Sequence, residues 1–274
     1  MKNRIKNTFN KLKEKNQAAL ITFLTAGDPN LDTCLKIINQ LPKAGVDIIE
    51  LGMAFSDPMA DGPVIQKSYK RSLKNGNTIN DIFNLVGSFR KNNSLTPIVL
   101  MGYFNPIYKY GVKKFIRDAE NKGIDGVLIV DLPPDTDQEI EKNFLNSQLD
   151  FIKLATPTTN ITRLKSIMQK ASGFLYYVSI TGITGAKIDN FSKIERSYNK
   201  LRKNIKLPFV VGFGINTIEK ARKVSKYSDG VVIGSVLVKE IEENLKKDSK
   251  ILQNIIKLVK NYSKHIKLSR LDNK

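Results

Sequence analysis

Short apolar runs that alternate with helical patterns are the feature that most restricts the fold of this chain. The runs are rich in Val, Ile and Phe, recur about every 25 to 30 residues, and are typical of βα units with a parallel sheet. We expect strands at residues 19–24, 47–51, 98–101, 126–130, 151–155, 174–178, 209–212 and 230–233. They are evenly spread, without a linker or a low-complexity break. The sequence therefore favours an α/β fold, a single (β/α)8 TIM barrel, over an open sheet.

The chain length of 274 residues fits a barrel of about 250 residues, so we expect a single TIM-barrel domain over residues 1–274. In the first segment, Ile5, Phe9 and Leu12 recur at helical spacing. Residues 1–16 are therefore expected to form an extra N-terminal helix that covers one end of the barrel. From about residue 240 to residue 274 the chain is rich in lysine, which predicts a helix with a basic, solvated face.

The formal charge of +19 at pH 7 raises the question of a nucleic-acid partner. The basic residues are spread from Lys2 to Lys274, they do not alternate with aromatic residues, and the chain has no Trp on which a base could stack. A solvated lysine-rich surface therefore explains the charge better than a nucleic-acid site, although the charge can still attract an anionic substrate. A basic binding protein without enzymatic activity stays as the alternative.

Cysteine and histidine each occur once, as Cys34 and His265. These counts exclude an internal disulfide and a Cys/His metal cage. They also exclude a Ser-His or Cys-His catalytic pair unless His265 serves, and that residue lies in the lysine-rich tail. No apolar run reaches the roughly 18 residues of a membrane span, so we expect a cytoplasmic protein with no membrane contact and no metal site.

The turns that follow the expected strands carry Asp, Thr, Ser, Gly and Pro, and in such barrels the active site lies at this face. Glycines occur in three late turns, at residues 182–185, 212–214 and 234–235. Glycine lets the backbone approach a bound group, and N–H groups at a helix start attract anions. The turns after the last two strands therefore predict a phosphate site, in which Ser235 can offer its hydroxyl and its N–H. Plain turn chemistry is the alternative.

Two acidic residues are candidates for proton transfer. Glu50 ends the second strand and faces the same way as Ile48, so it points into the barrel if Ile48 does. A lone carboxylate there is costly unless it has a partner or a function. Asp61 lies on the long loop that follows, which can bring it opposite Glu50, whereas Asp57 is better explained as a turn cap. Two carboxylates around one substrate are suited to proton transfer at two positions.

The segment 49–66, IELGMAFSDPMADGPVIQ, resembles the signature of the tryptophan synthase α chain family. Motifs at residues 25–29, 101–106, 131–133, 181–185, 212–215 and 234–235 are similar to the family in order and spacing, so the resemblance covers nearly the whole chain. Most family members have Pro at the position of Ala54, so this loop is expected to be slightly less stiff. The resemblance implies a lyase of tryptophan biosynthesis that splits indole-3-glycerol phosphate into indole and glyceraldehyde 3-phosphate.

The resemblance also implies roles for single residues. Glu50 matches the glutamate that moves protons on the indole C3 and the glycerol hydroxyl, and Asp61 matches the aspartate that holds the indole N–H. Thr184 matches a threonine of a mobile loop that closes over the substrate. The expected substrate-binding residues are Phe23, Leu100, Tyr103, Leu128, Tyr176 and Thr184, and the expected phosphate binders are Gly185, Phe213, Gly214, Gly234 and Ser235.

The family pairs with a β subunit, so the resemblance implies an α2β2 heterotetramer in which indole is channelled from one subunit to the other. Pyridoxal phosphate is expected only in the partner β subunit, with no cofactor in this chain. The loops 54–59, 105–110 and 131–136 are expected at the interface. A neighbouring phosphosugar isomerase or synthase stays as an alternative. Lys153 in the fifth strand is expected to face the helix layer, with a catalytic lysine, as in the related indole-glycerol phosphate synthases, as the alternative.

Overall fold

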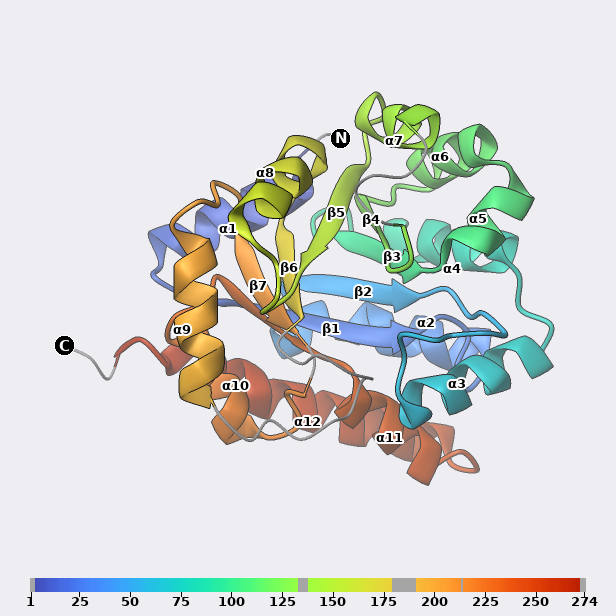
Figure 1. Ribbon diagram of the computed structural model, residues 1–274. Helices are drawn as coiled ribbons and strands as arrows, with labels where there is room; N and C mark the ends of the chain where they lie inside the picture. The colour runs from blue at the N-terminus through green and yellow to red at the C-terminus, as the bar shows by residue number, and fades with distance from the viewer. Residues whose placement is uncertain (1–2, 133–137, 179–190, 213, 272–274) are drawn as a thin grey trace.

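The computed structural model describes residues 3–132, 138–178, 191–212 and 214–271. In these ranges eight parallel strands close into a barrel in chain order (Figure 1). They are β1 (Ala19–Thr25), β2 (Ile48–Gly52), β3 (Ile98–Gly102), β4 (Gly126–Ile129), β5 (Asp150–Ala155), β6 (Leu175–Val178), β7 (Phe209–Gly212) and β8 (Gly230–Ile233). Each end lies within one residue of the sequence prediction, and the predicted (β/α)8 barrel is confirmed.

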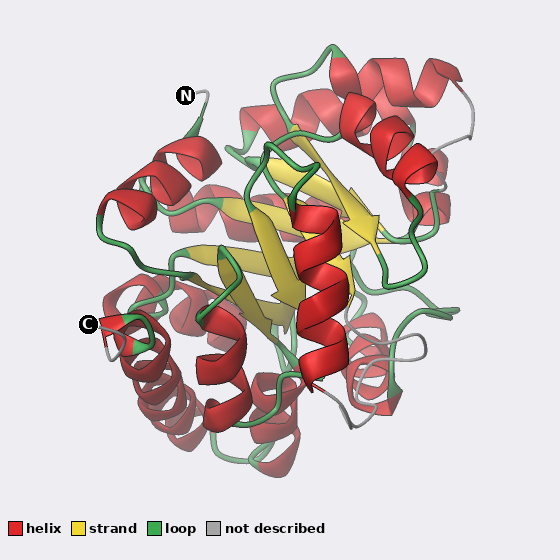
Figure 2. Ribbon diagram, turned by 60° about the vertical axis from the view of Figure 1, so that its left-hand side comes forward, coloured by secondary structure: helices red, strands yellow, loops and turns green. Residues whose placement is uncertain are grey.

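Helices surround this barrel on its outside (Figure 2). The described helices are α1 (Arg4–Glu14), α2 (Leu31–Gln40), the 3-10 turn η1 (Pro42–Ala44), α3 (Pro63–Lys74), α4 (Ile79–Arg90), α5 (Phe104–Tyr110), α6 (Val112–Asn121), α7 (Gln138–Leu145), α8 (Ile161–Lys170), α9 (Phe191–Arg202), α10 (Ile218–Ser225), α11 (Ser235–Glu243) and α12 (Asp248–Leu268). Within the described ranges, none of them combines the length and the apolar composition that crossing a membrane would require.

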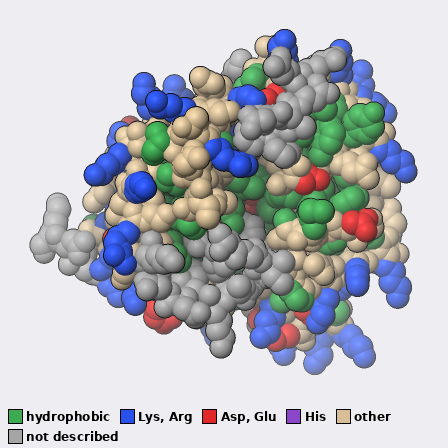
Figure 3. All heavy atoms as spheres, in the orientation of Figure 1, with side chains coloured by type: hydrophobic (Ala, Val, Ile, Leu, Met, Phe, Trp, Pro, Cys, Tyr) green, Lys and Arg blue, Asp and Glu red, His purple; other side chains and the backbone are tan. Residues whose placement is uncertain are grey.

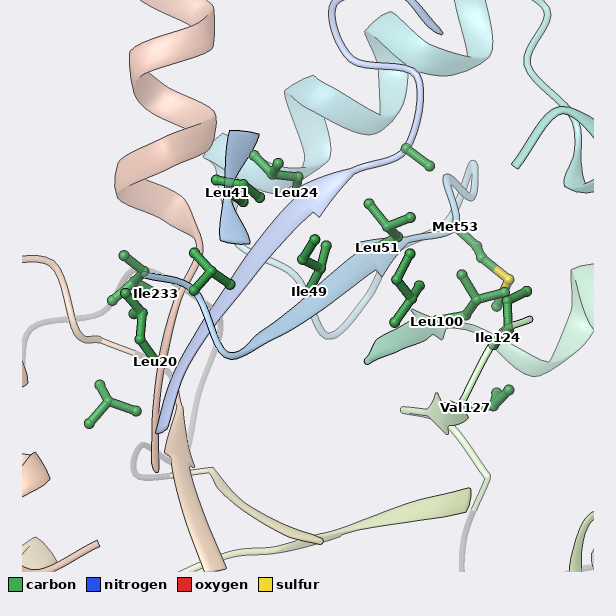
Figure 4. Packing of buried hydrophobic residues seen from close by; sticks show 14 of the residues in the cluster. Leu20, Leu24, Leu41, Ile49, Leu51, Met53, Leu100, Ile124, Val127 and Ile233 are labelled. Carbon is green, nitrogen blue, oxygen red and sulfur yellow. The ribbon is translucent and has the colours of Figure 1, made fainter. Parts of the chain in front are cut away.

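The alternation of side chains along each strand divides the apolar residues into two layers. On β2, Ile48 belongs to the cluster inside the barrel, whereas Ile49 and Leu51 belong to the cluster between the strands and the helices (Figure 4). Glu50 shares the inward phase of Ile48, as the sequence predicted. The phase of each strand thus decides which residues can reach a ligand at the mouth of the barrel.

One residue that was predicted to line the pocket lies in the outer layer, between the strands and the helices. Leu100 is fully buried in the outer cluster, beside Leu51 and Ile124 (Figure 4). Its neighbour Met101 belongs to the inner cluster. The prediction that Leu100 walls the indole pocket is therefore wrong, because a shift of one residue along a strand moves a side chain to the other face of the sheet.

The N-terminal helix α1 closes one end of the barrel, as predicted. Ile5, Phe9 and Leu12 join the inner cluster, and the ring centroids of Phe9 and Phe174 lie 5.8 Å apart. The guanidinium of Arg4 donates a 2.7 Å hydrogen bond to the buried carboxylate of Asp125. This end carries structural contacts, which leaves the opposite mouth for chemistry.

The C-terminal helix α12 is more than a solvated tail. Its lysines are exposed as expected, except Lys267, which is partly buried and pairs with Asp47, but the opposite face, with Ile251, Ile255, Val259 and Ile266, is fully buried. The helix packs against α10 and α11, which precede it in the chain, and against α2, which lies far from it in the sequence. The lysines therefore lie on one face of α12, and its opposite, apolar face packs into the helix layer around the barrel.

Candidate active site

The carboxyl-terminal ends of the strands surround a hollow at the mouth of the barrel opposite α1. Inward-facing strand residues and the following turns line it. The lining residues are Phe23, Asp61, Ile65, Met101, Tyr176, Gly214, Ile215, Val232, Gly234 and Ser235. Six of them, Phe23, Asp61, Tyr176, Gly214, Gly234 and Ser235, are residues that the sequence analysis selected. The fold thus brings together residues from both halves of the chain.

Asp61 is held in place by the end of β3. The Tyr103 hydroxyl donates a 2.7 Å hydrogen bond to Oδ2 of Asp61 and accepts one of 3.0 Å from the N–H of Ala60. The side-chain amide of Gln66 donates to the carbonyl of Asp61 at 2.7 Å. Asp61 is only 1% exposed, yet it lines the hollow. These contacts fix one carboxylate oxygen and leave the carboxylate at the wall of the hollow.

Glu50 lies in a drier environment. It is 1% exposed, and within the described ranges neither carboxylate oxygen has a hydrogen-bond partner. Across the sheet its neighbours in register are Phe23 on β1 and Val99 on β3, both apolar. Such a carboxylate is unfavourable in its charged form, because nothing replaces the water that it loses on burial.

The different surroundings separate the acid strengths of the two groups. Burial, and then the nearby charge of Asp61, raises the pKa of Glu50 to about 8. Burial raises the pKa of Asp61 to about 6, although the hydrogen bond from Tyr103 opposes this effect. At neutral pH Glu50 therefore keeps its proton while most of Asp61 is ionised. The same mouth of the barrel thus holds one carboxyl group that keeps its proton and one that is mostly ionised.

Tyr176 lines the hollow across from the acids and is 4% exposed. Burial, with the charges of Glu50 and Asp61, raises the pKa of its phenol well above the usual value, so it stays neutral. Its hydroxyl lies over Gly212 on β7, where an added Cβ would come within 2.2 Å of the Tyr176 oxygen. Glycine at this position therefore leaves room for the tyrosine.

The predicted phosphate binders lie at the ends of the last two strands. Gly214 has a φ of +73°, in the left-handed region that favours glycine. Gly234 is the N-cap of α11 and Ser235 is its first residue, so the N–H of Ser235 has no acceptor within the helix. Both line the hollow. The helix start therefore offers N–H groups to an anion.

The remaining predicted residues divide into two groups. Glu50, Leu128 and Tyr103 are buried and are not among the described residues that line the hollow. Thr184, Gly185 and Phe213 lie outside the described residues. Four lining residues, Ile65, Met101, Ile215 and Val232, were not among the predicted site residues, although Ile215 belongs to the motif at residues 212–215. Spacing by two selects Met101 before Tyr103 and Val232 before Gly234, whereas Ile65 lies in the first turn of α3, after the loop that carries Asp61.

Lys153 is directed away from this mouth, as the sequence predicted. Its ammonium lies 3.4 Å from Oε1 of Glu141 on α7 and 4.0 Å from the ring centroid of Phe151. Lys170 on α8 reaches the other oxygen of Glu141 at 2.5 Å. Burial lowers the pKa of Lys153, while the charge of Glu141 opposes the effect. The lysine therefore belongs to an ion cluster between β5 and two helices.

Known proteins share both the sequence pattern and this architecture. The family model described as tryptophan synthase alpha chain matches residues 9–267. The tryptophan synthase subunit alpha from Legionella pneumophila str. Paris is 38% identical, with each chain covered over 100% of its length and a TM-score of 0.91. The tryptophan synthase alpha chain from Legionella pneumophila subsp. pneumophila is 37% identical, with 98% of each chain covered and a TM-score of 0.90.

A more distant neighbour, from Mycobacterium tuberculosis tryptophan synthase, is 29% identical over 98% of this chain and 100% of the other, with a TM-score of 0.88. The family match therefore covers almost the whole barrel, including β2, the loop with Asp61 and the glycine turns that line the hollow. This chain belongs to the tryptophan synthase alpha chain family.

Proposed function

We propose that Glu50 and Asp61 carry out the lyase reaction of this chain, the cleavage of indole-3-glycerol phosphate in tryptophan biosynthesis. The observation that carries the proposal is the placement of two buried carboxylates, one protonated and one largely ionised, at one mouth of the barrel. A retro-aldol cleavage needs an acid for the ring carbon that leaves and a base for the hydroxyl.

In the first step, the proton of Glu50 passes to the indole C3. This step creates a positive charge on the ring nitrogen. The Asp61 carboxylate stabilises that charge and accepts a hydrogen bond from the indole N–H. Glu50, now ionised, takes the proton of the glycerol hydroxyl. The bond between C3 and the glycerol carbon then breaks, its electron pair returns to the ring as indole forms, and the aldehyde of glyceraldehyde 3-phosphate remains. Glu50 ends protonated again, now with the hydroxyl proton, while the proton that it gave stays on C3 of indole.

The phosphate is assigned to the turns after β7 and β8, where Gly214, Gly234 and Ser235 line the hollow. An anionic group held there orients the reacting bond toward the acids at the other side of the hollow. We assign Thr184 to loop closure and Gly185 and Phe213 to phosphate binding on the family resemblance alone.

The experiment that tests the proposal compares the wild-type chain with Glu50→Gln. We expect cleavage of indole-3-glycerol phosphate, followed as indole and glyceraldehyde 3-phosphate, to fall at least about 100-fold while substrate binding persists. Asp61→Asn should act in the same direction. Glu243→Gln is a matched control, because Glu243 is exposed on α11, away from the hollow, and forms an ion pair with Lys239 on the same helix. Glu50→Gln turnover at the wild-type rate, or turnover only of another phosphorylated sugar, would favour the phosphosugar alternative.

We also propose a β subunit as the partner of this chain. Beside the active-site mouth, Met59 and Tyr108 are 78% and 65% exposed, which is unusual for large apolar side chains. A groove of about 590 Å³ lies next to them, lined by Ala54, Phe55 and Pro106 among others. Figure 3 shows hydrophobic side chains gathered on this side of the molecule, over α5. The surface includes residues 54–59 and 105–110, two of the three segments expected at the interface, although the second forms part of helix α5 and is not a loop.

The interface is tested by mixing the chain with a purified β subunit. We expect complex formation on size exclusion and faster cleavage in the mixture. Tyr108→Glu should weaken both effects. Leu95→Glu is the matched control, because Leu95 is 75% exposed but precedes β3 at the other end of the barrel. Equal loss in both variants would argue against this surface.

Pyridoxal phosphate is assigned to the β subunit, which predicts that the purified α chain shows no absorbance of the bound cofactor and gains none on incubation with it. The cytoplasmic location and the single domain over residues 1–274 also stay predictions. Cell fractionation tests the first, and one cooperative unfolding transition by two probes tests the second.

A further inference from the structure

Tyr69 on α3 carries a buried polar group that the proposed reaction does not use. The side chain is 1% exposed, and among the described residues its hydroxyl has no hydrogen-bond partner. A buried hydroxyl without a partner costs about 1–3 kcal/mol, and a Phe side chain would avoid that cost. A donor at such a site therefore requires an explanation.

Tyr69 lies near the chain segments that carry the two acids. Ile65 and Tyr69, four residues apart on α3, are both buried on the side of the helix that faces the barrel, and Asp61 is buried on the loop just before this helix. The Tyr69 ring lies against Gly52, where an added Cβ would be 3.2 Å from it. Gly52 follows Glu50 by two residues on β2 and so shares its inward phase. Tyr69 thus lies over the strand segment that carries Glu50.

The polar groups around Glu50 differ in whether they already have a hydrogen-bond partner. Asp61 already accepts a hydrogen bond from the Tyr103 hydroxyl. Tyr176 has an interaction of its own. Glu50 offers two acceptor oxygens without a donor, and Tyr69 offers a donor without an acceptor. Burial, with smaller contributions from the charges of Asp61 and Glu50, raises the pKa of the Tyr69 phenol well above its usual value. It therefore stays a neutral donor.

We propose that Tyr69 is a positioning residue for Glu50: rotation of the Glu50 side chain brings its ionised carboxylate to the Tyr69 hydroxyl, which donates a hydrogen bond to it. The inference rests on the acid–base role of Glu50 proposed above. Once Glu50 has passed its proton to the substrate, it is a buried anion, and its stability depends on a donor. Tyr69 supplies the donor without adding a charge and holds the carboxylate for the return of the proton.

The test is Tyr69→Phe, which removes only the hydroxyl. We expect kcat for cleavage to fall about tenfold, with KM changed less than about twofold. The limb of the pH–rate profile that belongs to Glu50 should move to higher pH by about one pH unit, because the lost hydrogen bond favoured the charged form. The melting temperature should stay equal or rise.

A second measurement does not depend on turnover. The infrared band of the protonated Glu50 carboxyl, assigned by its loss in Glu50→Gln, can be titrated in the free chain, and its midpoint should rise in Tyr69→Phe. Tyr227→Phe is the matched control, since the Tyr227 hydroxyl is also buried without a partner among the described residues but packs on Tyr198 in the outer layer. An unmoved midpoint with wild-type kcat in Tyr69→Phe overturns the proposal. Failure of the wild-type chain to cleave its substrate would instead contradict the proposed function and leave the titration as a separate result.

Discussion

The hydroxyl of Tyr103 and the carboxylate of Asp61 are joined by a 2.7 Å hydrogen bond that connects the end of β3 to the loop after β2. Because the same hydroxyl accepts the N–H of Ala60, it fixes both the backbone and the side chain of that loop. The contact also favours the ionised form of Asp61, the form proposed to meet the indole N–H. Position and charge of this carboxylate thus depend on one tyrosine.

Tyr103→Phe should therefore impair the reaction in a pH-dependent way. The hydrogen bond lowers the pKa of Asp61, so its loss should raise that pKa above about 6 and leave less of the anion at neutral pH. We expect kcat/KM to fall about tenfold at pH 6.5 and by less at pH 8, where Asp61 is ionised in both proteins. Steady-state cleavage across this range measures the effect. A loss that is equal at every pH would show that Tyr103 acts only through packing.

Glu50 should make the fold less stable as the pH rises. Its pKa is raised from 4.5 to about 8 in the folded chain, so between these values the folded state holds a proton that the unfolded state releases. The contribution of Glu50 to the free energy of unfolding is largest below the unfolded-state pKa of 4.5. It is lost as the pH rises through the folded-state pKa of about 8, and the loss is roughly 5 kcal/mol at most. Glu50→Gln should therefore stabilise the chain more at pH 8 than at pH 5. Urea unfolding of both proteins at the two pH values measures this, and an equal difference would contradict the raised pKa.

Strand periodicity was sufficient to predict most of the fold. The strands are mostly apolar runs bounded by turn residues, with exceptions such as Glu50 in β2 and Lys153 in β5, and these local signals remain visible in a parallel barrel. The same alternation correctly predicted that Glu50 points into the barrel, because it shares the phase of Ile48. The prediction for Leu100 was wrong because it rested on the family resemblance, whereas alternation back from Tyr103 selects Met101.

Contacts made across the barrel could not be read from the sequence. Nothing in the order of residues shows that Tyr103 meets Asp61, 42 positions earlier, because the path of the intervening loop decides the contact. The buried partner of Lys153 was equally hidden, since Glu141 lies on a different element and only the packing of α7 on β5 brings it close. An unpartnered hydroxyl such as that of Tyr69 is a property of packing alone.

Gly234→Ala should weaken substrate binding more than it weakens the fold. The added Cβ would lie 3.0 Å from the Cβ of Phe23, which lines the same hollow, so this ring must shift. The methyl group would also stand beside the helix start assigned to the phosphate. We expect KM to rise about tenfold with a smaller change in kcat. Gly87→Ala on α4 is the control, since its Cβ would meet only the flexible chain of Lys122, and it should keep KM and gain about 1 kcal/mol of helix stability. Unchanged KM in Gly234→Ala would refute the assigned phosphate site.

Mutations of Lys153 and Glu141 should have different effects on stability, because Glu141 pairs with two lysines, Lys153 and Lys170, whereas Lys153 pairs with Glu141. Lys153→Met keeps the length of the side chain and leaves Glu141 paired with Lys170, so stability should change by less than about 1.5 kcal/mol and cleavage should persist. Glu141→Leu removes the acid between two ammonium groups and should cost about 3 kcal/mol or more, because an uncompensated charge then stays at a largely buried site. Thermal unfolding and cleavage assays on both variants measure the contrast. Loss of turnover in Lys153→Met with wild-type stability would instead support a catalytic lysine, since the lost ammonium would then be needed for chemistry and not for the cluster.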